Sequence, residues 1–149
     1  MTSQPAQAPA PGPLVAGFLR RAQSQQQATA VSQLLVHTWA AVDAELRGVI
    51  GPLGVSALLA RSLKLAARQH PLLAVAHAQA GIAPSMAALQ PGLAQLPLDQ
   101  AVAASQALLA SFEELLVELI GSALAERLLR PVLLQHTPGD APGSHAQTP

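Results

Sequence analysis

The sequence contains no cysteine and no tyrosine, and its 149 residues include only one tryptophan and two phenylalanines. The absence of cysteine excludes disulfide frameworks, zinc-thiolate sites, iron–sulfur clusters and thiol catalysis. Charged side chains are also scarce, at 11% of the chain, and the formal net charge is zero. A nucleic-acid-binding protein needs a basic surface for the phosphates, so this neutral chain is not expected to bind nucleic acid.

Hydrophobic residues make up half of the sequence, and most of them are alanine and leucine. These two residues lead the helix-propensity scale, whereas sheets favour β-branched and aromatic side chains. The composition therefore predicts an all-α fold. A neutral, weakly charged surface is poorly soluble on its own. We therefore expect a partner to cover an apolar helix face, either a second copy of the chain in a homodimer or another protein.

The two ends of the chain are rich in Pro, Gly, Ser, Gln and Thr. Residues 1–13 and 136–149 are therefore predicted to be disordered tails around a single helical domain at 14–135. The first tail lacks the charged and apolar regions of a signal peptide. The stretch from Gln69 to Leu98 carries no charged residue, but its prolines, glycines and polar residues argue against a membrane span. We expect a cytoplasmic protein that does not insert into membranes.

Apolar residues that recur at steps of four and three predict two long amphipathic helices. The first ends at Gly51 and Pro52, and its stripe consists of Leu35, Trp39, Val42, Leu46 and Val49. The second spans about Leu98 to Ile120, and its face consists of Ala101, Ser105, Leu108, Phe112, Leu115 and Leu119.

Each long helix is followed by a shorter one. The first of these runs from about Gly54 to Gln69, and the second from Ser122 to Arg130, where Pro131 is expected to end it. Upstream, a helix is expected to begin either near Leu14 or only after the polar run at 23–27.

An internal repeat appears at an offset of about 70 residues. Ile50-Gly51 pairs with Ile120-Gly121, and Leu58-Leu59 pairs with Leu128-Leu129. The pseudo-repeats cover about 29–70 and 98–131, and an Ala/Pro/Gly-rich linker at 71–97 with short helical turns joins them. The alternative is chance similarity between leucine-rich helices. Gly51 and Gly121 are predicted to be elbows, because glycine ends a helix at positive φ without a Cβ penalty.

Two such hairpins predict a four-helix bundle with both apolar faces buried. The expected core consists of Leu35, Trp39, Val42, Leu46, Ile50, Leu58, Leu59, Leu108, Phe112, Leu115, Leu119 and Leu128. Trp39 and Phe112 lie on the apolar stripes and are expected to pack in this core, although they can alternatively line a ligand cavity.

No set of residues in the sequence matches a known catalytic or metal-binding arrangement. Glu114 and Glu118 lie one helical turn apart, but a di-metal bundle site would need a Glu-x-x-His motif, which is absent. No pair of histidines has the spacing of metal ligands on one helix face. We therefore predict no enzyme activity, no metal and no cofactor. If the chain is an enzyme, Glu114, Glu118 and His37 are the first residues to mutate.

Two basic clusters are candidate interaction sites for an acidic partner or an anionic lipid surface. The first consists of Arg61, Lys64 and Arg68, and the second of Arg127 and Arg130. The alternative is that both are solvated faces that complement the helix ends.

The segment 118–132, ELIGSALAERLLRPV, is similar to a C-terminal motif of a group of small bacterial all-helical proteins with no known activity. The stretch 54–67, GVSALLARSLKLAA, also resembles that group. The resemblance covers about two-thirds of the chain. It implies a bacterial source and a helical domain, and it carries over no catalytic or binding residue.

Three functions remain as hypotheses. The first is a non-enzymatic helical interaction module with a regulatory or assembly role. The second is a bundle that binds an apolar small molecule or lipid, or an amphipathic protein on a membrane or storage-granule surface. The third is an enzyme, which the absence of a nucleophile–base set disfavours.

Overall fold

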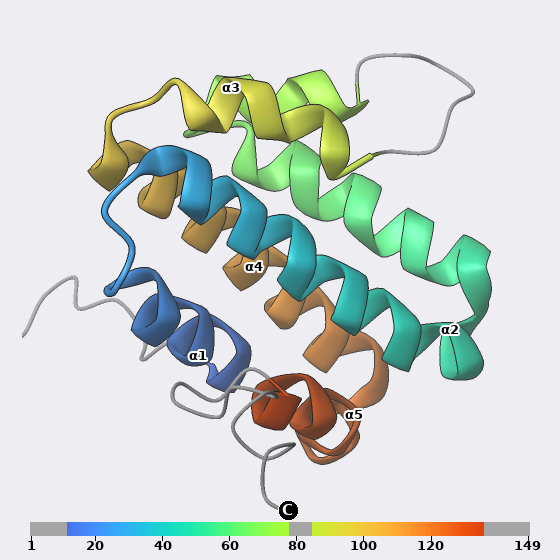
Figure 1. Cartoon of the computed structure of the whole chain (residues 1–149). Coiled ribbons are helices and arrows are strands. Elements are labelled where there is room, and N and C mark those ends of the chain that lie inside the picture. Colours follow the sequence, from blue (N-terminus) through green and yellow to red (C-terminus); the bar gives the residue numbers. More distant parts are fainter. Residues whose placement is uncertain (1–11, 78–84, 136–149) are drawn as a thin grey trace, which may run out of the picture.

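The computed structural model describes residues 12–77 and 85–135, and it contains five α-helices and no strand within these ranges (Figure 1). The predicted all-α fold is confirmed. The helices are α1 (Pro13–Ala22), α2 (Ala28–Ala66), α3 (Gln90–Ala94), α4 (Leu98–Ile120) and α5 (Ser122–Gln135). Two short 3₁₀ segments, Pro71–His77 and Ala87–Leu89, lie between α2 and α3. The two predicted tails fall outside the described residues, except Gly12 and Pro13, which belong to the start of α1.

Helix α2 is bent at Gly51, whose backbone has φ 77° and ψ 162°. This region of backbone conformation is essentially restricted to glycine. Pro52 suits the start of the second half, because a proline in the first turn has no N–H to leave unpaired. In Figure 1 the chain doubles back at this point, so the two halves of α2 form a hairpin.

Gly121, between α4 and α5, has a similar conformation, with φ 89° and ψ 155°. Both bends lie toward the same end of the molecule, at the lower right of Figure 1. A Cβ atom added at either glycine would meet nothing within 4 Å. The glycines are therefore required by backbone conformation and not by close packing.

All but one of the twelve predicted core residues are buried or partly buried. Leu35, Val42, Leu46, Leu59, Leu108 and Phe112 are buried, and Trp39, Ile50, Leu58 and Leu128 are partly buried against the same core. The rings of Trp39 and Phe112 meet edge to face, with centroids 4.9 Å apart. Leu115 is half-buried.

The assignment of Leu119 to the core is wrong, because this side chain is 58% exposed. It lies in the last turn of α4 but off the face that packs on the core, which carries Leu116 and Ile120 there. Val117 and Glu118 in the same turn are also exposed, whereas Leu116 one turn earlier is fully buried.

The region 71–97 is more than a linker. In its described parts, 71–77 and 85–97, it forms the two 3₁₀ segments and α3, and it contributes Leu73, Met86, Leu89 and Leu93 to the core. Leucine and methionine at these positions bury apolar surface, which outweighs the local proline and glycine content. Residues 78–84 of this region lie outside the described residues.

The two ends of the domain also differ from the expectation. Helix α1 begins at Pro13, which settles the open choice in favour of the early start, and it buries Leu14, Val15 and Phe18. Helix α5 does not stop at Pro131 but continues to Gln135. Val132 is fully buried, and burying this side chain offsets the one backbone hydrogen bond that the proline removes.

Candidate functional site

The N-terminus of α1 has no cap of its own. The residue before the helix is Gly12, which has no side chain to cap it, and the first turn contains no acidic residue. The first N–H groups of any helix lack partners within the helix and carry partial positive charge. In this chain the missing acceptor comes from another helix.

Glu113 of α4 supplies that acceptor. The backbone N–H of Leu14 donates to its Oε2 at 2.9 Å, and the N–H of Val15 donates to its Oε1 at 3.3 Å. The side chain is only 7% exposed, so the carboxylate is withdrawn from water and both oxygens have a protein partner. A Cβ added at Gly12 would come within 2.5 Å of the carboxyl carbon. Glycine at position 12 therefore allows the chain to approach Glu113.

The electrostatics of Glu113 are set by opposing effects. Burial raises the pKa of Glu113, the hydrogen bonds from Leu14 and Val15 lower it, and the negative charge of Glu126 raises it. The net pKa lies above the ordinary value of a glutamate. Burial disfavours the charged form more strongly than the two N–H groups stabilise it.

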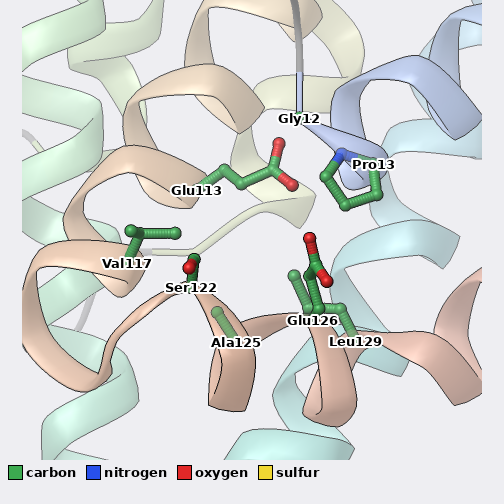
Figure 2. Close-up of a pocket in the computed structure, with 8 residues that line it drawn as sticks. All are labelled: Gly12, Pro13, Glu113, Val117, Ser122, Ala125, Glu126 and Leu129. Atoms are coloured by element: carbon green, nitrogen blue, oxygen red, sulfur yellow. The ribbon is translucent and has the colours of Figure 1, made fainter.

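Glu113 lines a small pocket between α1, α4 and α5, shown in Figure 2. Its volume is about 210 Å³, and its lining residues are Gly12, Pro13, Glu113, Val117, Ser122, Ala125, Glu126 and Leu129. In Figure 2 the carboxylates of Glu113 and Glu126 both point toward Pro13. Small-molecule sites typically enclose about 300–1,000 Å³, so this pocket is smaller than the usual ligand site. We interpret the arrangement as a cap on the N-terminus of α1, with Glu113 as the acceptor and a small pocket beside it.

The sequence reasoning did not find this role for Glu113. The signal was present in the helical spacing, since Leu109, Glu113 and Leu116 step by four and three and the two leucines are fully buried. A glutamate between two core leucines on one face predicts a buried carboxylate that needs donors. The uncapped start of α1 supplies them.

The residues considered first for catalysis are not brought together. Glu114, Glu118 and His37 are all exposed, and they lie on two different helices. Among residues 12–77 and 85–135, no group of three or more His, Asp or Glu side chains is placed to hold a metal ion.

The two basic clusters remain on separate segments. Arg61 and Lys64 lie on α2 and Arg68 lies just beyond its end, whereas Arg127 and Arg130 lie on α5. All five side chains are exposed. None of them forms an ion pair within the described part of the chain, where the pair of Arg47 with Asp43 is found. A role as solvated faces accounts for this placement.

A group of exposed aliphatic side chains flanks the two glycine bends. Val49 and Leu53 lie beside Gly51, and Val117, Leu119 and Leu124 lie beside Gly121; these five residues are named the elbow face. Leu53 is 84% exposed. Single exposed leucines are ordinary, but a group at one end of the molecule is typical of a contact surface.

Helix α2 is also long and apolar enough to cross a membrane, judged by length and composition alone. Only 28% of its most apolar 18-residue window is buried inside the fold. The bend at Gly51 interrupts the helix, so its two halves are not one straight segment.

The chain matches no protein-family model, and comparisons with curated proteins and with solved structures find no match. The function must therefore be argued from the residues of this chain.

Proposed function

We propose that the protein is a non-enzymatic helical interaction module that pairs with a second copy of itself through the elbow face. The observation that carries the proposal is the exposure of five large aliphatic side chains beside two positive-φ glycines. Burying aliphatic surface yields about 25 cal/mol per Å². The exposed side chain of Leu53 does not gain this free energy in the isolated chain, and it would gain it when a second copy covers the side chain.

Charge favours a second copy as the occupant. Arg47 lies one turn before Gly51 and is exposed, and Glu118 lies one turn before Gly121 and is also exposed. When the Gly51 bend of one copy meets the Gly121 bend of the other, Arg47 of one copy faces Glu118 of the other. Twofold symmetry places this pair of opposite charges in the interface twice. The side chain of Arg47 already bonds Asp43 at 3.0 Å through one Nη atom, which holds it in place.

The proposal extends to the internal arrangement. The two halves of α2 form one hairpin and α4 with α5 forms the second, which makes a four-helix core of two pseudo-repeats. The similar backbone angles of Gly51 and Gly121 and the paired sequences around them support this view. The chain's scarcity of charge also fits a surface that is partly covered. No reaction is assigned to Glu113, because both of its oxygens accept backbone hydrogen bonds.

Sedimentation velocity over a concentration series tests the proposal. The wild-type protein is expected to sediment as a dimer, and a variant with Leu53→Ser and Leu119→Ser is expected to sediment as a monomer. The two side chains are exposed, so the double variant is expected to keep the helical circular dichroism of the wild type. Its melting temperature is expected to lose the concentration dependence that dimer formation gives the wild type.

Val75→Ser is the matched control, because Val75 is 57% exposed but lies on the 3₁₀ segment away from both bends. It is expected to remain a dimer. A wild-type protein that stays monomeric at high micromolar concentration contradicts the proposal, as does a double variant that dimerises normally.

The second candidate is an amphipathic protein that coats a membrane or storage-granule surface. It is favoured by the apolar window of α2, of which the fold fully buries only 28%. Flotation with phosphatidylcholine vesicles separates the two functions. A self-associating module stays in the soluble fraction, whereas a surface-coating protein floats, and Leu53→Ser weakens its flotation.

A further inference from the structure

The end of α1 carries two adjacent arginines whose guanidinium groups converge. A Cβ placed on Gly17 would lie 3.7 Å from Nη1 of Arg21 and 3.8 Å from Nη2 of Arg20. Side chains three and four residues after a position lean back over it in a helix. Both guanidinium groups therefore lie close to Gly17, where the side chain of Leu133 also lies.

The convergence is not explained by an acidic partner. Within residues 12–77 and 85–135, neither arginine forms an ion pair with a carboxylate. Arg21 donates from Nη2 to the hydroxyl of Thr38 on α2 at 3.2 Å, and its Nε is buried without a partner. Thr38 is itself fully buried. Arg21 is thus held in a fixed position by a neutral group, and no carboxylate of the described residues pairs with its charge.

The surroundings make this positive charge costly. Burial lowers the pKa of Arg21, and the neighbouring charge of Arg20 lowers it further. Leu133 of α5 also lies at the site, with its Cδ2 3.2 Å from the same Cβ position on Gly17. Two like charges beside apolar side chains are stabilised when an anion lies between them.

We propose that Arg20 and Arg21, at the end of α1 and beside Leu133 of α5, form a binding site for a phosphate-type oxyanion. In this site each guanidinium donates N–H groups to the same anion. The resulting charge-assisted hydrogen bonds are expected to be about 2.8 Å long. The C-terminus of α1 does not by itself require two arginines, because one basic residue in the last turn already complements the helix dipole. The site is separate from the elbow face and does not depend on dimer formation.

Isothermal titration with inorganic phosphate, at constant ionic strength set with chloride, tests the site. The wild-type protein is expected to bind one phosphate per chain and to melt at a higher temperature in its presence. Arg20→Gln removes an exposed guanidinium and is expected to weaken binding about tenfold or more. Arg21→Lys keeps the charge but not the planar fork, and is expected to weaken binding without unfolding the protein.

Arg61→Gln is the control, because Arg61 is exposed on α2 and does not approach Gly17. It is expected to bind phosphate as the wild type does. A second series with phosphatidylcholine vesicles containing phosphatidic acid identifies the source of the phosphate. Binding to vesicles that Arg20→Gln abolishes assigns a lipid headgroup, and binding of free phosphate alone assigns a soluble ligand. Absence of saturable binding in both series, or equal weakening by Arg61→Gln, overturns the proposal.

Discussion

Glu113 illustrates how one buried carboxylate ties two distant parts of the chain together. It lies 99 residues from Leu14, whose N–H group it accepts. Without it, the first turn of α1 would have to leave these N–H groups unpaired in a buried position, which costs about 1–3 kcal/mol for each group. The burial of Leu14, Val15 and Phe18 therefore depends on an acid on α4.

The raised pKa of Glu113 predicts a pH dependence of stability. Because the folded protein holds this proton more tightly than the unfolded chain, the contribution is fully present below the ordinary glutamate pKa of about 4.3. It is lost as the pH rises through the raised pKa of the folded state. The free energy of unfolding of the wild type is therefore expected to fall relative to that of Glu113→Gln between pH 4 and pH 7.

Urea denaturation at a series of pH values measures this difference. Glu114→Gln, on the exposed side of α4, is expected to keep the wild-type profile. Glu126→Gln removes the nearby negative charge and is expected to flatten the decline. A wild type that gains stability relative to Glu113→Gln as the pH rises would show that the charged form is the favoured one.

The two halves of α2, and likewise α4 and α5, are separated by a glycine whose conformation no other residue adopts easily. Gly51→Ala and Gly121→Ala are each expected to lower the free energy of unfolding by about 1–3 kcal/mol, because alanine is strained at these backbone angles. The cost is conformational, since a Cβ at either position meets no atom within 4 Å.

Gly48→Ala is the control for these substitutions. Gly48 lies inside α2 with helical backbone angles, and its Cβ position is equally open. Alanine there is expected to raise stability by about 0.4–1 kcal/mol, since it restricts the unfolded chain. Equal effects at positions 48 and 51 in urea denaturation would contradict the assigned role of the bend.

The sequence reveals the helices and their breaks because these depend on local chemistry. The stripe of Leu35, Val42 and Leu46 and the Gly51-Pro52 break both follow from spacing and backbone preference. Contacts between helices do not follow in this way. Pro131 ends a helix by local rules, yet α5 continues because Val132 is buried by other helices.

The same limit explains the errors at the candidate sites. Leu119 has the spacing of a core residue, but its exposure depends on which face of α4 the neighbouring helices cover. The pairing of Glu113 with α1 joins residues 99 apart, and the convergence of Arg20 and Arg21 requires the helical backbone to be in place. Spacing identifies a face, whereas only the packed structure shows what lies against it.

The molecule taken together is a neutral, aliphatic helical domain. Five of the seven large aliphatic side chains that are exposed in its described residues lie beside the two bends. The proposed burial of the elbow face against a second copy would account for the low charge and for the exposed leucines beside Gly51 and Gly121. The pairing of one bend with the other is the central claim, and it predicts which residues of the two copies meet.

Directed cross-linking tests this pairing most directly, because the wild-type chain has no cysteine to interfere. Leu53→Cys and Leu119→Cys chains that differ in mass are mixed and oxidised, with Val75→Cys as the control. The account predicts that mixed disulfide dimers of the first two chains far exceed those of either chain with Val75→Cys. Cross-links that form equally in all combinations, or not at all, would contradict it.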